Sequence, residues 1–371
     1  MLFSTLRSLT ITLFFATGTL AHPGETVDAT EELAAARVRH TLADLQYEEL
    51  SKCNDDAESR SRAEQAMKRR MATFTRLRKE RGITSDTHPY IHRRDNGAFA
   101  KWAATSHDKT GTLKFTTDTP HSEIFGANST CILTPDNIIG PYFVHGEQIR
   151  SSIAEGHRGV PLHLEISFIN INTCKATPNL LIDIWQCNAT GVYSGVSAAG
   201  QAGLKTTFLR GVQQTDKEGV VEFDTIFPGH YQGRASHIHV SVHSGATVLP
   251  NNTYTGGTIH HISQLFFDQA LINAVEQTAP YSTNRVAKTS NAADMYTGYS
   301  ATSAYDPFPE YVLLDANDIT KGIFMWLEVG FNANVNYEAY KTIAAYLGPN
   351  GGTNNPAYDF RKAISPPPTH G

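Results

Sequence analysis

The sequence has no strong excess of charge of either sign and only one long apolar run. Its 31 Lys and Arg residues stand against 36 Asp and Glu residues, so the formal net charge is -5. This balance argues against nucleic acid or an anionic membrane as a partner. Beyond residue 21 no stretch is apolar enough to cross a bilayer, and no internal repeat is visible. With 371 residues and 40% apolar content, the composition is that of a soluble chain with one large domain and appendages.

The single apolar run lies in residues 1–21. This segment has one positive charge at Arg7, and the small residues Thr19 and Ala21 come directly before His22 at the cleavage-site positions. These features are typical of a secretory signal peptide, and the segment is too short to span a bilayer. We therefore expect a secreted, extracellular protein whose mature chain begins at His22.

Cysteine is scarce, since the chain has only Cys53, Cys131, Cys174 and Cys187. In a secreted protein such a set usually oxidises, which predicts two disulfides. Cys174 and Cys187 flank a predicted strand, and its extended length would hold them too far apart to bond with each other. Of the remaining pairings we favour Cys131 with Cys187 and Cys53 with Cys174.

Three sequons for N-linked glycosylation fit the same compartment. They begin at Asn128, Asn188 and Asn251. Asn251 is the site most expected to carry a glycan, because its neighbours have the composition of a loop. A glycan on Asn188 would lie close to Tyr193, at the edge of the candidate site described below.

Hydrophobic spacing divides the chain into four segments. After the signal peptide (1–21), residues 22–127 are expected to form a helical N-terminal segment and a linker, because apolar residues recur there at helical spacing. Residues 128–348 are expected to form the catalytic domain, and the Pro-rich residues 349–371 a disordered tail. We interpret the N-terminal helices as a packing or dimerisation element, so a homodimer is one arrangement to consider.

Short stretches of alternating apolar and polar residues predict strands in the third segment. The clearest runs from Leu162 to Phe168, where His163, Glu165 and Ser167 would form the solvated face of a half-buried strand. Further strands are predicted at 180–185, 221–225, 238–242, 264–267, 311–314 and 322–331. This pattern predicts a mainly β fold, a two-sheet β-sandwich preceded by the helical N-terminal segment. Residues 284–309 are expected to form a long active-site loop.

Two histidines one residue apart mark the centre of the catalytic segment. On a strand that begins near Ala235, His237 and His239 share one face, while Ile238 and Val240 share the other. Two imidazoles at this spacing are close enough to bind one metal ion, and the sheet fixes both of them. Taken alone, the pair is also compatible with two exposed strand histidines.

Two tyrosines are expected near these histidines. Tyr231 follows the Pro228-Gly229 turn, which can bring its phenol back towards the face of His237. Tyr193 follows a buried strand and a Gly-containing turn. Two tyrosines and two histidines offer hard oxygen and nitrogen donors, which suit a ferric ion better than zinc, because zinc sites usually take Cys, His or carboxylate.

With these residues in place, the chain resembles the intradiol ring-cleavage dioxygenases, nonhaem Fe(III) enzymes that open catechols between the two hydroxyl groups. The matching elements occur in the family's order over roughly residues 131–335, and their combination is very specific although each alone is weak. They are Gly140-Pro141-Tyr142-Phe143, the W-x-x-x-x-x-G-x-Y run from Trp185 to Tyr193, T-D-x-x-G at Thr215 to Gly219, P-G-x-Y at Pro228 to Tyr231, R-x-x-H-x-H from Arg234 to His239, and Gln264.

The resemblance implies a β-sandwich and a set of site residues. The implied Fe(III) ligands are Tyr193, Tyr231, His237 and His239. By analogy with the family, Tyr231 leaves the metal when a catechol chelates and acts as a base for a substrate hydroxyl. Arg234 is then expected to stabilise negative charge on the ring, and Gln264 to share the site. The implied reaction consumes O2 and gives a muconate-type diacid.

Two other functions fit parts of the sequence. Removal of the signal peptide would expose His22 as the first residue, as a copper oxidase with an N-terminal histidine brace requires, although Pro23 restricts that backbone. The other is a secreted, non-catalytic β-sandwich that binds glycans or another protein. Metal content separates the three functions, because iron, copper and no metal are distinct outcomes.

Overall fold

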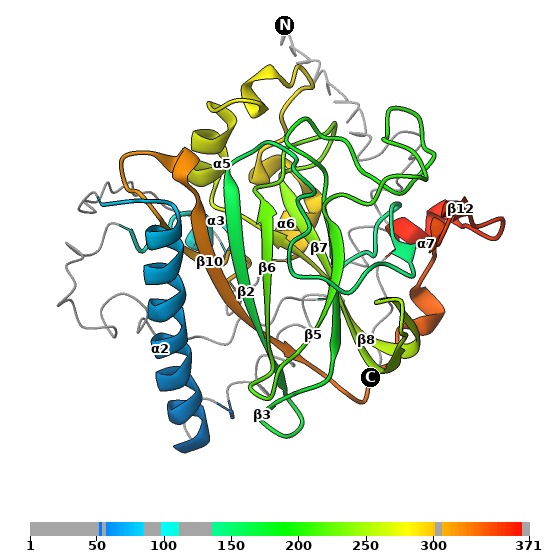
Figure 1. Cartoon of the computed structure of the whole chain (residues 1–371), viewed down its shortest axis with the longest axis horizontal. Coiled ribbons are helices and arrows are strands. Elements are labelled where there is room, and N and C mark those ends of the chain that lie inside the picture. Colours follow the sequence, from blue (N-terminus) through cyan, green and yellow to red (C-terminus); the bar gives the residue numbers. More distant parts are fainter. Residues whose placement is uncertain (1–51, 54–56, 85–97, 111–135, 301–305, 366–371) are drawn as a thin grey trace, which may run out of the picture.

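Two β-sheets that share one apolar core form the centre of the molecule (Figure 1). The computed structural model describes residues 52–53, 57–84, 98–110, 136–300 and 306–365. The predictions for the signal peptide, the first N-terminal helix, His22, Asn128 and Cys131 lie outside these residues. Within them, the predicted two-sheet β-sandwich is confirmed, and no helix combines the length and apolar character that a membrane crossing requires.

The strands form two large sheets and one small one. The first large sheet has the order β3-β2-β10-β9, with β6 also paired to β2, and its strands are β2 (Pro161–Asn170), β3 (Lys175–Ala176), β6 (Val220–Ile226), β9 (Glu310–Leu313) and β10 (Ile323–Phe331). The second has the order β5-β4-β7-β8, from β4 (Leu181–Trp185), β5 (Arg210–Gln214), β7 (His237–Val248) and β8 (Tyr254–Phe266). The small sheet contains β1 (Val144–His145), β11 (Ala345–Gly348) and β12 (Gly351–Asn354).

The core between the large sheets determines where the histidines lie. Ile238 and Val240 of β7 are buried in one apolar cluster with residues of the first sheet, such as Leu164 and Ile166. Because alternate residues of a strand point to opposite faces, this packing places the histidines of β7 on the outer face of the second sheet. That face carries the candidate site.

Helix α2 (Ala57–Glu80) covers the outer face of the first sheet (Figure 1). Phe74 and Leu77 of the helix pack in one cluster with residues of β9 and β10. Arg69 Nε and Arg70 Nε donate to the two carboxylate oxygens of Glu165, at 3.0 Å and 2.9 Å. Burial alone would raise the pKa of Glu165, but the two guanidinium groups outweigh it and lower this pKa. The interpretation of this helix as a packing element is confirmed.

The prediction that β2 is half-buried is wrong, because helix α2 covers its polar face. His163, Glu165 and Ser167, the residues expected to face solvent, are all buried. The alternation of apolar and polar residues was identified correctly, but the polar face meets protein instead of water. A carboxylate such as Glu165 tolerates this position because two arginines neutralise it and supply hydrogen bonds.

One predicted disulfide is confirmed and the other is wrong. Cys53 and Cys174 are bonded, and this link fastens the chain just before α2 to the turn between β2 and β3. Cys187 is a free, buried thiol whose Sγ contacts the carbonyl oxygen of Gly229 at 3.5 Å, so it is not paired with Cys131. Burial raises the pKa of Cys187 to about 12, which keeps the thiol neutral near pH 7.

Short helices occupy the connection between β8 and β9. They are α5 (Gln269–Glu276), the 3-10 turns η1 (Tyr281–Thr283) and η2 (Asn291–Ala293), and α6 (Met295–Tyr299). The long loop predicted over 284–309 therefore contains local helical structure where it is described. The remaining elements are α3 (Ala98–Ala103), η3 (Ile319–Lys321) and η4 (Glu338–Tyr340).

The predicted disordered tail is also corrected for residues 349–365. These residues form β12 and α7 (Phe360–Ile364), drawn in red in Figure 1. The Asp359 carboxylate caps α7 by accepting hydrogen bonds from the backbone N–H groups of Arg361 and Lys362. The carbonyl of Ala363 then accepts from Gly140 N at 2.9 Å, which joins this segment to the chain beside the candidate site.

We predict that Glu165→Gln lowers the free energy of unfolding by about 3 kcal/mol, because it leaves two guanidinium groups without their shared counter-charge. Glu218→Gln is the matched control. Glu218 also pairs with Arg69, but its side chain is 34% exposed, so its loss should cost about 1 kcal/mol or less. Urea denaturation measures both, and equal effects of the two substitutions would contradict the argument.

Candidate metal centre

The pairing of strands β4, β7 and β8 aligns three residues of the site side by side across the sheet. His239 of β7 lies opposite Trp185 of β4 on one side and opposite Gln264 of β8 on the other. The Trp185 indole stacks on the His239 imidazole, with ring centroids 4.8 Å apart and an interplanar angle of 5°. His237 lies two residues earlier on the same face. The sheet register, and not a flexible loop, therefore sets the positions of both imidazoles.

The two imidazoles approach each other through their Nε2 atoms. His237 Nε2 is 3.2 Å from His239 Nε2 and 3.3 Å from the Tyr231 hydroxyl oxygen. On the other edge of its ring, His237 Nδ1 lies 2.6 Å from the Ala235 carbonyl oxygen. Because a carbonyl only accepts, Nδ1 must carry the proton, and in the neutral ring Nε2 then offers a lone pair to the site.

Glycine allows the two tyrosine turns to meet. Gly191 has φ +83°, and a Cβ there would lie 2.3 Å from the His230 carbonyl oxygen, in the turn that carries Tyr231. The rings of Tyr193 and Tyr231 lie 5.6 Å apart, edge to face. Among the described residues the Tyr193 hydroxyl is buried without a hydrogen-bond partner. Burial raises the pKa of both phenols, so without a metal both are protonated near pH 7.

A second glycine allows the chain to approach His239. Gly140 has φ +81°, and a Cβ at this position would lie 2.6 Å from His239 Cε1. The Gly140 backbone therefore lies directly against the edge of the imidazole, which is possible because glycine has no side chain. Together with the stacked Trp185, it leaves His239 little freedom to rotate.

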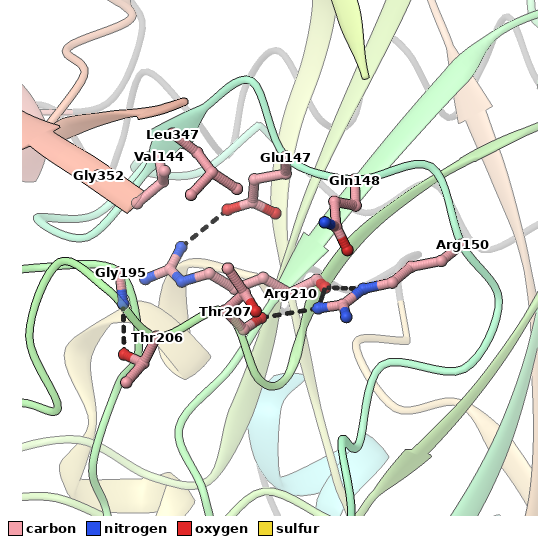
Figure 2. Close-up of a pocket in the computed structure, with 10 residues that line it drawn as sticks. All are labelled: Val144, Glu147, Gln148, Arg150, Gly195, Thr206, Thr207, Arg210, Leu347 and Gly352. Atoms are coloured by element: carbon pink, nitrogen blue, oxygen red, sulfur yellow. Dashed lines mark hydrogen bonds and ion pairs between the residues drawn. The ribbon is translucent and has the colours of Figure 1, made fainter. Parts of the chain in front are cut away.

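Arg210 fixes the turn that carries Tyr193, and the sequence did not reveal this role. Its guanidinium donates to the Ser194 carbonyl oxygen from Nε at 3.0 Å and from Nη2 at 2.8 Å. Its Nη1 donates to Glu147 at 3.0 Å (Figure 2). Arg210 and Glu147 line a small cleft between β5 and the small sheet. Ser194 directly follows Tyr193, so Arg210 positions the tyrosine through the backbone.

A buried pair of acids supports Arg210. Burial raises the pKa of Glu147, and burial together with the Glu147 carboxyl raises the pKa of Asp183 well above its usual value. Asp183 also accepts a hydrogen bond from the Tyr254 hydroxyl at 3.3 Å. Two adjacent buried carboxyl groups with one guanidinium retain a proton, which reduces the charge buried at this place.

Arg234 and Gln264 lie beside the histidines, as the sequence analysis expected. Arg234 is completely buried, and its Nη2 donates to Gln264 Oε1. Its Nε donates to Asp294 Oδ2 at 2.9 Å. The sequence analysis did not single out Asp294. No local signal could have revealed it, because 60 residues separate it from Arg234.

The structure therefore brings all six predicted site residues together: Tyr193, Tyr231, Arg234, His237, His239 and Gln264. Within the part of the chain that is described, no group of three or more His, Cys, Asp and Glu side chains could hold a metal ion. A metal bound here would need the two phenols as well as the two imidazoles. This donor set is the one that favours a ferric ion over zinc.

Comparison with known proteins agrees with this site. Residues 138–266 match the family model described as Dioxygenase, and this range contains all six site residues. Solved structures similar to the chain include an intradiol ring-cleavage dioxygenase from Tetranychus urticae, with 28% identity over 56% of this chain and 98% of that chain and a TM-score of 0.47. No curated protein matches.

Two further similar structures come from bacteria. One is the dioxygenase domain of a dioxygenase carbohydrate-binding protein fusion from a cellulolytic Streptomyces species, with 23% identity over 54% of this chain and 98% of that chain and a TM-score of 0.34. The other is a mercury-inhibited catechol 1,2-dioxygenase from an Acinetobacter species, with 19% identity over 54% of this chain and 63% of that chain and a TM-score of 0.35.

The match to the dioxygenase family model covers residues 138–266, and within this range the six site residues make the chain similar to the intradiol ring-cleavage dioxygenases. This similarity supports an enzymatic function for the chain. This finding disfavours the non-catalytic binding module. The copper alternative depends on His22, which lies outside the described residues.

We predict that Gly140→Ala displaces His239, and Gly200→Ala is its matched control. Both glycines have a positive φ, so both substitutions carry a similar backbone strain, but a Cβ at Gly200 has nothing within 4 Å. Gly140→Ala should therefore cost about 1 to 3 kcal/mol more in unfolding free energy. It alone should also shift the NMR signals of the His239 ring. Equal stability losses, with unchanged His239 signals, would contradict the clash.

Proposed function

We propose that the protein cleaves the ring of a catechol-type substrate between its two hydroxyl groups, with O2 as co-substrate. One observation supports this best: the phenols of the buried Tyr193 and the partly buried Tyr231 converge with two imidazoles, and a buried arginine lies beside them. Intradiol cleavage adds both oxygen atoms of O2 to the ring carbons that carry the hydroxyl groups. Catechol and O2 together therefore account for every atom of a cis,cis-muconate-type diacid.

We infer that the site holds Fe(III) through Tyr193, Tyr231, His237 and His239. The fit rests on the donors themselves. His237 Nε2 lies within 3.3 Å of both His239 Nε2 and the Tyr231 hydroxyl oxygen, and the Tyr193 hydroxyl is buried without a partner among the described residues. When bound, Fe(III) would act as a Lewis acid that makes the chelated catecholate reactive towards O2. Since burial keeps both phenols protonated in the metal-free protein, their protons must leave when they become ligands.

The other steps use side chains of this chain. Tyr231 is only partly buried and shares its turn with Pro228 and Gly229, so it is the phenol that can move. Its Oη would accept the proton of a substrate hydroxyl. The Arg234 guanidinium would stabilise the negative charge that develops on the ring, since its charge is fixed in place before the reaction begins. Gln264 would hold one edge of that guanidinium.

The proposed reaction predicts a distinct response for each site residue. The purified protein should contain about one Fe(III) per chain and be reddish, because phenolate oxygen binds ferric iron with charge-transfer absorption. Tyr193→Phe and His239→Ala should lose iron and colour. Tyr231→Phe should keep iron on three ligands and turn over slowly. Arg234→Ala should keep iron and bind catechol, with turnover reduced by about 10²- to 10³-fold.

Tyr311→Phe is the matched control for the tyrosines. Tyr311 is a buried tyrosine of β9 in the other large sheet, so its phenol should not affect iron, colour or turnover. Metal analysis, visible absorption and oxygen uptake with a panel of catechols measure these outcomes. Stoichiometric zinc in colourless protein would refute the metal assignment. A yellow semialdehyde, the product of cleavage beside the hydroxyl groups, would refute the position of cleavage.

We also propose that the protein is secreted and carries a glycan on Asn251. The signal-like residues 1–21 and the Cys53–Cys174 disulfide support export. Asn251 is exposed in the turn between β7 and β8. Asn188 is only partly exposed, and its Oδ1 accepts hydrogen bonds from Thr190 and Val192 in the turn before Tyr193. The homodimer stays a prediction.

Intact-mass analysis of protein from a eukaryotic secretion host tests this proposal. The secreted chain should begin at His22, and Asn251→Gln should remove one glycan from its mass. Asn188→Gln should leave the glycan mass unchanged, because that side chain is held in its turn. A product that stays in the cell or begins at Met1 would contradict secretion, and a glycan that persists in Asn251→Gln would contradict the site.

A further inference from the structure

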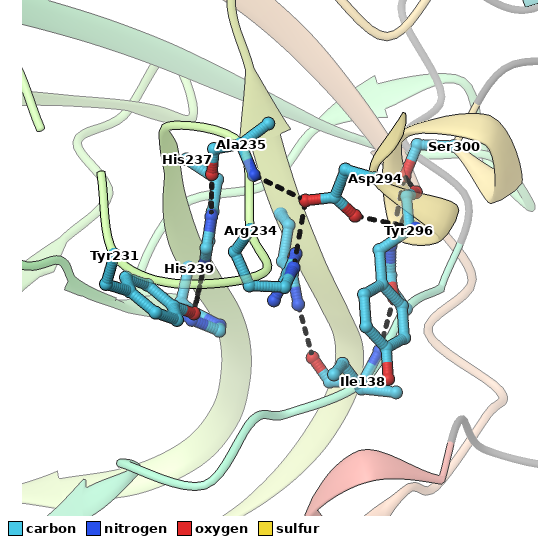
Figure 3. A network of polar contacts seen from close by, with 11 residues as sticks. Ile138, Tyr231, Arg234, Ala235, His237, His239, Asp294, Tyr296 and Ser300 are labelled. Atoms are coloured by element: carbon cyan, nitrogen blue, oxygen red, sulfur yellow. Dashed lines mark hydrogen bonds and ion pairs between the residues drawn. The ribbon is translucent and has the colours of Figure 1, made fainter. Parts of the chain in front are cut away.

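Asp294 is the one acidic side chain that contacts Arg234 among the described residues, and the proposed mechanism gives it no task. Its Oδ2 accepts from Arg234 Nε at 2.9 Å and from Ala235 N at 2.8 Å, while its Oδ1 accepts from Tyr296 N at 2.8 Å (Figure 3). The side chains of Arg234 and Asp294 are both 0% exposed. Both oxygens of the Asp294 carboxylate therefore accept hydrogen bonds, from the Arg234 side chain and from two backbone N–H groups.

The other contacts of Arg234 leave one donor group unoccupied. Nη2 donates to Gln264, and the guanidinium carbon lies 4.4 Å from the centroid of the Tyr296 ring. Nη1 is buried and has no hydrogen-bond partner among the described residues. A buried guanidinium donor without a partner is costly, unless a bound molecule satisfies it. Nη1 is therefore the group through which Arg234 can contact a substrate.

Asp294 reaches the histidines through a single peptide unit. The N–H of Ala235 donates to Asp294, and the carbonyl oxygen of Ala235 accepts from His237 Nδ1 at 2.6 Å. One carboxylate thus fixes the side chain of Arg234 and the residue that orients His237. Figure 3 shows this arrangement, with Arg234 between the histidine pair and Asp294.

We propose that Asp294 is the positioning residue for Arg234, and that it holds the guanidinium so that Nη1 remains directed at the bound substrate. This inference rests on the proposed function. Asp294 compensates the buried charge of Arg234 and fixes Nε, while Gln264 fixes Nη2, so the planar group cannot rotate about its own axis. The residue comes from the connection between β8 and β9, directly before α6, which it also caps.

The test combines Asp294→Asn with Arg234→Ala in a double-mutant cycle on the iron-loaded protein. Asp294→Asn keeps the shape of the side chain but removes the charge and weakens the hold on Nε, so kcat should fall by about 10- to 100-fold. KM and iron content should change by less than about 3-fold, because no ligand is removed. In the Arg234→Ala background, Asp294→Asn should reduce kcat by less than about 3-fold, since no guanidinium remains to be positioned.

Asp306→Asn is the matched control. Asp306 lies after the same helices and is also paired with a mostly buried cation, His107, at 2.7 Å. The neighbouring carboxylates Asp268 and Asp306 outweigh burial and raise the pKa of His107 to about 10, so the substitution removes a real ion pair. It should lower thermal stability and leave kcat within about 2-fold of the wild type. A fall in kcat equal to that of Asp294→Asn would reduce Asp294 to a structural role.

The Tm of the metal-free variants distinguishes failure of this inference from failure of the proposed function. Arg234→Ala and Asp294→Asn should each lower Tm, because each leaves one charge or one donor buried without its partner, and the double variant should recover part of the loss. Additive Tm losses, or an Asp294→Asn variant with wild-type kcat, would overturn the inference. Failure of the wild type to open any catechol would instead overturn the proposed function. The Tm cycle would still measure the coupling of the pair.

Discussion

The register of β7 between β4 and β8 is the constraint on which the site depends. It places His239 in one row with Trp185 and Gln264, and it places Ile238 and Val240 in the core. A shift of one residue would exchange the two faces, because side chains alternate along a strand. The histidines would then enter the apolar core, and isoleucine and valine would replace them at the site. Burial of the apolar face therefore enforces the geometry of the polar face.

The outer faces of both sheets are buried under segments that lie far away in the sequence. Helix α2 places two arginines on Glu165, the connection before α6 places Asp294 on Arg234, and α7 reaches Gly140. Each buried charge in these contacts meets an opposite charge and additional hydrogen bonds. Such pairs offset the cost of removing ions from water and add little net stability. Their main effect is to fix side chains in one orientation.

Local patterns in the sequence were sufficient to predict the main strands and to select six residues that lie together in the structure. The period-2 alternation identified β2, β4, β6 and β7, and the ordered motifs identified six residues that the structure brings together. Contacts over long sequence separations were not predictable. Asp294 and the burial of Glu165 depend on such contacts, and so does the order of residues 349–365. Cys187 was assigned to a disulfide from its compartment alone, but the fold buries it as a thiol beside Gly229.

Three of the four donors of the site are oriented by protein groups that are not donors themselves. His237 is oriented by the Ala235 carbonyl, His239 by Trp185 and the Gly140 backbone, and Tyr193 by the Ser194 peptide that Arg210 holds. Neighbouring protein groups therefore maintain the convergent arrangement of these side chains. Under the proposed function, a cation that binds the four donors would stabilise the folded state, because the donors converge only there.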